Sequence, residues 1–276
     1  MPFHKPKSAL VIAGHGSTVN PDSSAPTFAH ADEIKRRGVF AEVVCAFWKE
    51  EPSLRQVRYM VESDDVYVVP NFISEGYFTR TVIPRELGLA GAKSGHDRRE
   101  IKYCEPVGNH ARMTDLLLHR AREVAPGVPP QEASLLIIGH GTSLNENSGA
   151  AVKEQVRRIA ARKEFGEVFG VFMEEEPFVT DWRKIATKRN VIAVPFFVSD
   201  GLHSYQDIPV LLGIEAAPTE AASKMEVFRR NPYHVGGREI FYASAIGTES
   251  LFADVVLDQV VRFDEQHALQ EAASAA

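Results

Sequence analysis

Short apolar runs alternate with segments of helical periodicity along most of the chain, which is the order expected of an α/β protein. Apolar runs that end at glycine or proline are typical of buried parallel strands. We expect such strands at Ser8–Ala13, Ala41–Trp48, Val66–Val69, Ile101–Tyr103, Ser134–Ile138, Glu167–Met173, Val191–Val194 and Glu239–Tyr242. The clearest helical patterns run over residues 23–37 and 149–163.

The two halves of the chain repeat each other at a constant offset of 125 residues. From Gly14 to Pro84 the halves align without a gap, with 24 identities in 71 positions. The shared motifs are Gly-His-Gly at 14–16 and 139–141, Glu-Glu-Pro at 50–52 and 175–177, Ser-x-Gly at 74–76 and 199–201, and Ile-Pro at 83–84 and 208–209. The pattern predicts two tandem, doubly wound parallel-sheet α/β domains, related by internal duplication.

The repeat also predicts the domain boundaries. We expect a first domain over residues 1–125, a second over 131–264 that carries the main metal site, and a flexible tail over 265–276. A proline-rich linker, Ala125–Pro130, joins the halves. The second half has 14 additional residues within about 216–237. A long loop inside a compact domain is often functional.

Composition excludes several classes of protein. With 44% hydrophobic and 25% charged residues, the chain is an ordinary globular sequence. It has no apolar run of membrane-spanning length and no signal-peptide pattern, so we expect a cytoplasmic protein without a membrane partner. Cys45 and Cys104 lie in apolar context and are expected to be buried thiols. The net charge of −6 and the lack of a basic stripe argue against nucleic acid.

Three candidate metal ligands, His140, Glu176 and His203, each follow a different predicted strand of the second half. The carboxyl ends of parallel strands meet at one edge of a sheet, so these side chains are expected to share a crevice. Two imidazoles and a carboxylate suit a divalent metal such as Fe, Co, Ni or Zn and leave coordination positions open. Glu174 and Asp207 add negative charge nearby, which favours a cation.

Other interpretations of these residues remain open. Each Gly-His-Gly could be a tight turn whose histidine caps the next helix, and for His15 this is as good an interpretation as a functional one. The run of three glutamates that ends at Glu176 could be a solvated helix start, and Glu175 stays ambiguous. In the first half Phe78 stands where the second half has His203, so the complete set of ligands is found in one copy only.

The ordered motifs resemble a known family. They are Gly-His-Gly-[Ser/Thr] after the first strand, Glu-Pro after the second and Pro-x-Phe-[Val/Ile]-Ser-x-Gly-x-His after the third. This set resembles the class II tetrapyrrole chelatases, and among them the sirohydrochlorin cobaltochelatase/ferrochelatase (CbiX-type) family, in a two-domain form. The resemblance covers about residues 8–263. It implies a bilobal fold with a tetrapyrrole-binding cleft, and ATP-independent insertion of Co²⁺ or Fe²⁺ into sirohydrochlorin.

The resemblance also implies roles for individual residues. His140, His203 and Glu176 match the family's paired histidines and acidic partner, as both metal ligands and catalytic residues. The metal is then a substrate (Co²⁺ or Fe²⁺, with Ni²⁺ a further candidate), and no organic cofactor is expected. For the polycarboxylate tetrapyrrole we expect Arg80 and Arg85 to bind carboxylates and Phe78 and His15 to contact the ring. Arg80 and Arg85 could equally be solvated residues at a helix start.

A non-catalytic metal- or tetrapyrrole-binding protein on the same scaffold is the alternative function, and the missing histidine at Phe78 gives it weight. The sequence leaves the choice between a monomer and a homodimer open, as it does the choice of metal and of tetrapyrrole. A hydrolase or phosphotransferase is disfavoured because the chain has neither a Gly-x-Ser-x-Gly elbow nor a phosphate loop.

Overall fold

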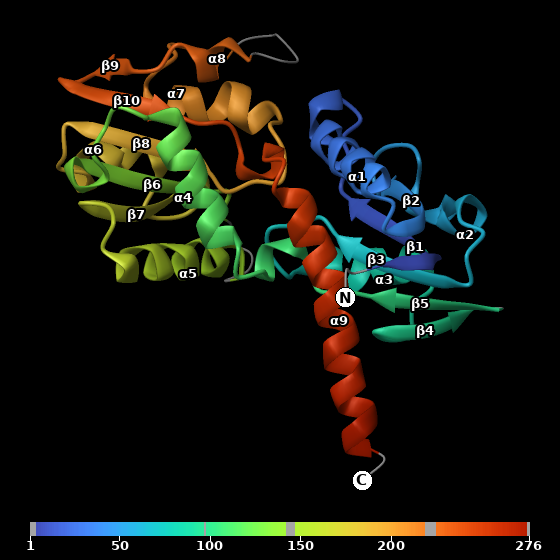
Figure 1. The fold of residues 1–276 in the computed structure, drawn as a ribbon. Helices are drawn as coiled ribbons and strands as arrows, with labels where there is room; N and C mark the ends of the chain where they lie inside the picture. Colours follow the sequence, from blue (N-terminus) through green and yellow to red (C-terminus); the bar gives the residue numbers. More distant parts are fainter. Residues whose placement is uncertain (1–3, 97, 142–146, 219–224, 275–276) are drawn as a thin grey trace. The chain divides into compact units, whose positions relative to one another are not determined.

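The computed structural model describes residues 4–96, 98–141, 147–218 and 225–274, which form two five-stranded sheets with flanking helices (Figure 1). The chain divides into two compact units. Unit 1 consists of Met1–His110 and Ser250–Ala276, and unit 2 of Ala111–Glu249. Each unit is described separately below.

Both sheets have the same topology. In unit 1 the strand order is β2-β1-β3-β5-β4, and in unit 2 it is β7-β6-β8-β10-β9. Unit 1 contains β1 (Lys5–Gly14), β2 (Phe40–Phe47), β3 (Asp65–Pro70), β4 (Lys93–His96) and β5 (Arg99–Tyr103). Unit 2 contains β6 (Ala133–Gly139), β7 (Glu167–Phe172), β8 (Asn190–Pro195), β9 (Tyr233–Val235) and β10 (Arg238–Tyr242).

The predicted fold class is confirmed, with one strand per sheet that the pattern did not indicate. Four strands of each sheet are parallel, as expected, and an edge strand (β4 or β9) pairs antiparallel with β5 or β10. Both edge strands are short and carry polar residues, so they lack the apolar run that marks a buried strand. β9 lies within the additional residues of the second half, together with the short helix α8 (Glu226–Arg229).

The first helix of each half is long, and the next two are short. α1 (Ala25–Arg37) and α5 (Asn147–Arg162) pack on their own sheets. The second and third helices are α2 (Val57–Met60) and α3 (Ile83–Leu87) in unit 1, and α6 (Trp182–Ile185) and α7 (Ile208–Leu212) in unit 2. A π-helical turn precedes each third helix, at Phe78–Val82 and at His203–Asp207. Such turns are frequently found at functional sites.

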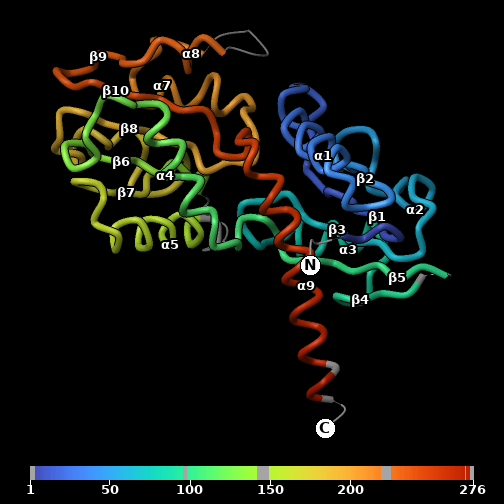
Figure 2. The backbone as a smooth tube through the Cα atoms, in the orientation of Figure 1, coloured from blue at the N-terminus to red at the C-terminus, as the bar shows by residue number. Residues whose placement is uncertain are grey.

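The last helix of each half belongs to the compact unit of the other half. α4 (Met113–Val124) packs on α5 and β8, whereas α9 (Phe252–Ser274) packs on α1 and β3 (Figures 1 and 2). In unit 1, the α9 residue Asp264 accepts hydrogen bonds from Tyr67 Oη at 2.7 Å and Lys5 Nζ at 2.5 Å. The compact units therefore differ from the expected domains 1–125 and 131–264, because a sequence repeat records duplication but not where its final helix packs.

The expected tail over 265–276 is also structured along most of its length, because α9 continues to Ser274. No helix of the described residues is long and apolar enough to cross a membrane. Cys45 and Cys104 are buried free thiols, as predicted, and burial raises the pKa of Cys45 to about 12.

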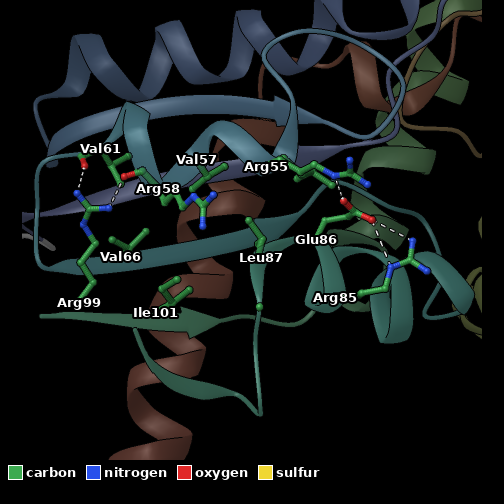
Figure 3. Close-up of a pocket in the computed structure, with 12 residues that line it drawn as sticks. Arg55, Val57, Arg58, Val61, Val66, Arg85, Glu86, Leu87, Arg99 and Ile101 are labelled. Atoms are coloured by element: carbon green, nitrogen blue, oxygen red, sulfur yellow. Dashed lines mark hydrogen bonds and ion pairs between the residues drawn. The ribbon is translucent and has the colours of Figure 1, made fainter. Parts of the chain in front are cut away.

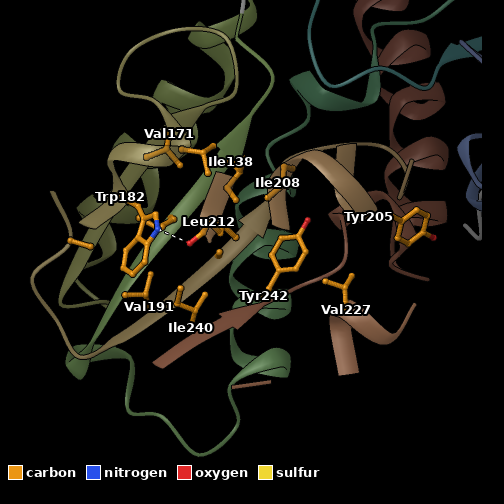
Figure 4. Close-up of a cluster of buried hydrophobic side chains, with 14 residues drawn as sticks. Ile138, Val171, Trp182, Val191, Tyr205, Ile208, Leu212, Val227, Ile240 and Tyr242 are labelled. Atoms are coloured by element: carbon orange, nitrogen blue, oxygen red, sulfur yellow. Dashed lines mark hydrogen bonds between the residues drawn. The ribbon is translucent and has the colours of Figure 1, made fainter. Parts of the chain in front are cut away.

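Both faces of each sheet are buried, and the face that the short helices cover carries one hydrophobic cluster in each unit. In unit 2 the cluster includes Ile138, Val191 and Ile240 from three strands and Trp182 and Ile208 from α6 and α7 (Figure 4). In unit 1 the matching cluster joins side chains of β1, β2, β3 and β5 to Leu54, Val57 and Ile83. Burying these side chains fixes the strands, and the carboxyl ends of the strands in turn position the motifs of the repeat.

Candidate metal centre and its counterpart in the first unit

The Gly-His-Gly motif follows the first strand of each unit and needs its second glycine. Gly141 has φ of +72°, and a Cβ there would lie 2.7 Å from Glu175 Cγ. Gly16, with φ of +69°, is equally close to Glu50 Cβ. A residue with a side chain at either position would have a strained backbone conformation, and its Cβ would collide with the glutamate. The loop that presents each histidine is therefore tightly turned against the Glu-Glu-Pro segment.

The ring orientation of both loop histidines is set by the backbone. Nδ1 of His140 lies 2.8 Å from the carbonyl oxygen of Gly141, and Nδ1 of His15 lies 2.8 Å from that of Gly16. A carbonyl oxygen only accepts hydrogen bonds, so Nδ1–H is the donor in both rings. Nε2 of the neutral ring therefore keeps its lone pair, which is available to a metal ion or a proton.

His203 is the first residue of a π-helical turn that is held from two directions. The Tyr242 hydroxyl donates to the carbonyl oxygen of Ser204 at 2.8 Å. On the other side, the amide of Gly247 donates to the carbonyl of Phe197 at 2.9 Å, and a Cβ on Gly247 would lie 2.0 Å from Val198 O. The backbone of the His203 loop thus rests directly on a glycine, and no other residue fits there without a shift.

The structure brings the two predicted histidines together. The ring centroids of His140 and His203 lie 5.0 Å apart, with an interplanar angle of 75°. Both imidazoles are partly exposed, at 40% and 47% of their side-chain surface. Each has an acidic neighbour: Glu174 lies 3.7 Å from Nδ1 of His140, and Asp207 lies 2.6 Å from Nδ1 of His203. A carboxylate on Nδ1 orients a ligand histidine and leaves Nε2 for the metal.

Glu176, the third predicted ligand, is placed differently. It follows β7 and is exposed, and it makes no hydrogen bond or ion pair among the described residues. Its carboxylate does not form a compact set with the two imidazoles. Among the described residues, the structure therefore supports the two histidines as a pair but gives Glu176 no contact with them.

The described residues contain one compact group of three ligand-type side chains, and it lies elsewhere. In unit 2, ligand atoms of His119, Glu123 and Glu249 all lie within 4.8 Å of one another. Arg120 already occupies this group, because its Nη1 donates to Glu123 at 2.9 Å and its Nη2 forms an ion pair with Glu249 at 2.8 Å. A guanidinium supplies the positive charge there, so the group is an ion-pair network and an unsuitable place for a metal ion.

In unit 1 the position of the histidine pair is an aromatic cluster. The Phe78 ring lies 4.8 Å from His15 and 5.1 Å from Trp48, and Trp48 lies 5.4 Å from His15. Lys49 Nζ lies 4.5 Å from the centre of the Trp48 ring. Both acidic neighbours are replaced, since Lys49 and Val82 stand where unit 2 has Glu174 and Asp207. Unit 1 therefore presents a cluster of edge-to-face aromatic rings with a lysine beside it.

The two predicted carboxylate-binding arginines are each paired with a carboxylate of the protein. Nε of Arg80 lies 3.0 Å from Glu75, and Nη2 of Arg85 lies 3.0 Å from Glu86. Both guanidiniums are more than half exposed. The Arg80–Glu75 pair is exposed on both sides and contributes little free energy, whereas the Glu86 side chain is 7% exposed and also pairs with Arg55.

Glu50, the first glutamate of the Glu-Glu-Pro motif in unit 1, has a structural role. Glu50 accepts hydrogen bonds from the amide of Ser17 at 3.1 Å and from the hydroxyl of Ser24 at 2.5 Å. It thereby braces the loop after His15 against α1. Glu175 is its counterpart in unit 2, where it lies 3.4 Å from Lys153, and this favours the structural interpretation of the residue that the sequence left ambiguous.

Sequence reasoning missed Trp48, Lys49 and Tyr242 as parts of these sites. The signal was present in the repeat itself, because Trp48 aligns with Met173 and Lys49 with Glu174. These exchanges lie next to the motif residues and change both aromatic character and charge. Tyr242 also has a counterpart, because Tyr103 donates to the carbonyl oxygen of Thr79 at 2.7 Å in unit 1, but this pair of tyrosines lies outside the stretch with the constant offset of 125 residues.

Two tandem units of this topology, with histidines after the first and third strands of the second, define the class of chelatase-like α/β proteins. The chain belongs to the CbiX family, whose model matches residues 9–124 and again 134–263. It is 44% identical, over 269 residues, to a protein of Halobacterium salinarum named probable sirohydrochlorin cobaltochelatase. That alignment covers 91% of this chain and 90% of the relative.

Shorter relatives and solved structures agree with this assignment. A sirohydrochlorin cobaltochelatase of Methanocaldococcus jannaschii is 30% identical over 141 residues, which are 96% of its length and 41% of this chain. A Deinococcus radiodurans protein described as similar to chelatases matches 91% of this chain, with a TM-score of 0.75 and 29% sequence identity. The matched part is 54% of that larger protein. SirB of Bacillus subtilis, solved with Fe³⁺, shares the fold with a TM-score of 0.68 at 19% identity, covering 93% of this chain and 95% of SirB.

Proposed function

We propose that this protein inserts a divalent metal ion, Co²⁺ or Fe²⁺, into sirohydrochlorin or a closely related tetrapyrrole without ATP. The observation that carries the proposal is the His140–His203 pair, whose rings lie 5.0 Å apart with a carboxylate beside each Nδ1. The name of the relative with 44% identity favours cobalt as the metal. Nitrogen ligands of this type suit either metal.

Metal insertion replaces two pyrrole N–H protons by one metal ion, so the site must deliver a cation and remove protons. His140 and His203 hold the metal through Nε2, and an imidazole that has released the metal can act as the base that accepts a pyrrole proton. Glu174 and Asp207 stabilise the imidazolium that results, since each lies beside an Nδ1. Glu176, exposed and free of protein partners among the described residues, accepts the second proton or guides the incoming metal.

The first unit contributes contacts to the tetrapyrrole. Phe78 and Trp48 offer aromatic surface for a flat macrocycle, with His15 as their polar neighbour. Sirohydrochlorin carries many carboxylates, and Arg80 and Arg85 bind some of them after exchange with Glu75 and Glu86. Lys49 adds a cation at the aromatic cluster.

A direct assay tests the proposal. Purified protein is mixed with sirohydrochlorin and Co²⁺ or Fe²⁺ in the absence of nucleotide, and the absorption change of metal insertion is followed against a protein-free control. We expect catalysed insertion that is lost in His140→Ala. A rate equal to the control with both metals would refute the enzyme and leave a carrier function. Full activity in His140→Ala would move the site elsewhere, with His15 the next candidate.

A further inference from the structure

The two units differ at one core position in a way that opens a pocket in unit 1. Val57, the first residue of α2, aligns with Trp182, the first residue of α6. Both residues belong to the core cluster on the same face of their sheets. A large aromatic side chain in one copy is therefore replaced by a small aliphatic one in the other.

In unit 2 the Trp182 indole fills this space completely. The side chain is 1% exposed, and its Nε1 donates to the carbonyl oxygen of Leu212 at 3.1 Å (Figure 4). Two guanidinium groups lie against the ring, with Arg183 Cζ at 5.5 Å and Arg238 Cζ at 5.6 Å from its centre. The protein thus shows what the site accepts: a flat aromatic ring between two arginines.

In unit 1 the same surroundings remain, but the indole is missing. A pocket of about 470 Å³ lies over Val57, with Val61, Val66, Leu87 and Ile101 as its apolar walls (Figure 3). Arg58 and Arg99 take the places of Arg183 and Arg238. Arg99 donates to the carbonyl of Val61 at 2.7 Å, as Arg238 donates to the carbonyl of Ala186, the residue that aligns with Val61. The arginine frame is therefore conserved between the units.

The pocket in unit 1 also has a positive rim that unit 2 lacks. Arg55 and Arg85 line it and share one carboxylate, that of Glu86 (Figure 3). Thr180 and Val210 stand at the two arginine positions in unit 2. Four arginines against one glutamate leave an excess of positive charge around an apolar floor. Nε of Arg99 is buried and has no hydrogen-bond partner within the described residues.

We propose that this pocket is a binding site for a small, flat aromatic carboxylate, separate from the metal centre. The ring occupies the place that the indole of Trp182 has in unit 2, over Val57 and beside Arg58 and Arg99. The carboxylate replaces part of the interaction of Glu86 with Arg55 and Arg85, because a bidentate arginine–carboxylate contact is the strongest polar interaction the rim offers. The proposal does not depend on the chelatase activity.

Indole-3-acetate is a suitable probe, because it joins the ring of Trp182 to a carboxylate. Isothermal titration of the full chain is expected to show one saturable site. Val57→Trp supplies the missing indole and should weaken binding at least tenfold, while metal insertion stays at the wild-type rate. Unchanged affinity in Val57→Trp, or no saturable binding to the wild type at millimolar probe, would overturn the proposal.

Two further variants test the proposed binding site independently, in case Val57→Trp does not fold well. Arg55→Gln should weaken indole-3-acetate several-fold and indole-3-ethanol, the neutral analogue, much less; equal losses would contradict the assigned carboxylate contact. Trp182→Val opens the corresponding space in unit 2 between Arg183 and Arg238. A folded Trp182→Val protein should bind the neutral analogue at a second site, and a stoichiometry that remains at one would show that the arginine frame does not select the ring.

Discussion

Phe78 and His203 occupy the same position in the two units, each as the first residue of a π-helical turn that follows the third strand. One scaffold therefore presents a phenyl ring in unit 1 and an imidazole, the proposed metal ligand, in unit 2. The neighbours differ accordingly: Lys49 and Val82 accompany Phe78, whereas Glu174 and Asp207 accompany the histidine pair. After the duplication, one copy has an aromatic cluster where the other has the proposed metal centre.

Exchanging these two residues tests this separation. His203→Phe removes one of the paired imidazoles and should lower the rate of metal insertion about 100-fold or more, the scale of a lost acid–base group. The assay is the absorption change of sirohydrochlorin with Co²⁺, and circular dichroism checks the fold.

The matched control adds Phe78→His to His203→Phe, which moves the histidine to unit 1. We expect no recovery, because Lys49 repels a cation and Val82 cannot orient the new ring. Recovery to near the wild-type rate would show that any scaffold copy with two histidines suffices and that the acidic neighbours are unimportant.

The carboxylate of Asp207 should matter through His203. Asp207→Asn keeps the shape but removes the charge 2.6 Å from Nδ1, so metal affinity or insertion rate should fall about 10- to 100-fold. Titration with Co²⁺, followed by its absorption, measures the affinity. Asp181→Asn is the control, because Asp181 is a partly exposed acidic residue that is paired with Lys184 in the same unit. An equal effect of both variants would mean a general charge effect.

Gly247 supports the His203 loop by direct backbone contact. Its Cβ in Gly247→Ala would meet Val198 O at 2.0 Å, so the loop must move. We expect about 1–3 kcal/mol lower stability, as for overpacking, together with slower insertion. Gly108→Ala creates the same collision with Ile73 O at 1.7 Å in unit 1. It should lower stability similarly in urea unfolding but affect the binding of Co²⁺ much less, and equal loss of Co²⁺ binding in both would contradict the assignment.

Lys163 is strained at the end of α5. It has φ of +55°, where α1 has Gly38 at +62° in the aligned position. A left-handed conformation costs a residue with Cβ about 1–2 kcal/mol, so Lys163→Gly should raise the free energy of unfolding by about 1 kcal/mol. Gly38→Lys, the reverse exchange, should lower it by a similar amount. A stability decrease in Lys163→Gly would mean that the side chain makes a compensating contribution.

The sequence was sufficient for the strand order along the chain and for the histidine pair, because both follow from apolar runs and from motifs repeated at a fixed offset. The edge strands β4 and β9 were missed because they are short and polar. The exchange of α4 and α9 was missed because amphipathic helices do not record which sheet they cover. Trp48 joins the aromatic cluster through a side-chain contact with Phe78, and no spacing rule predicts such a contact.

The sequence motifs also did not predict that Arg80 pairs with Glu75 and Arg85 with Glu86. The sequence around an arginine beside a motif loop does not show whether its ion-pair partner is a substrate or a neighbouring glutamate. Comparing the repeats position by position is more informative, since Val57 against Trp182 and Lys49 against Glu174 each indicate where one unit has changed its chemistry.

The histidine pair of unit 2 is the proposed binding site of the metal ion. Anomalous diffraction at the cobalt edge, from crystals soaked in Co²⁺, locates the ion itself. One strong peak is expected about 2.1 Å from Nε2 of both His140 and His203. A peak at His15 or at the His119, Glu123 and Glu249 group, with none at the pair, would contradict it.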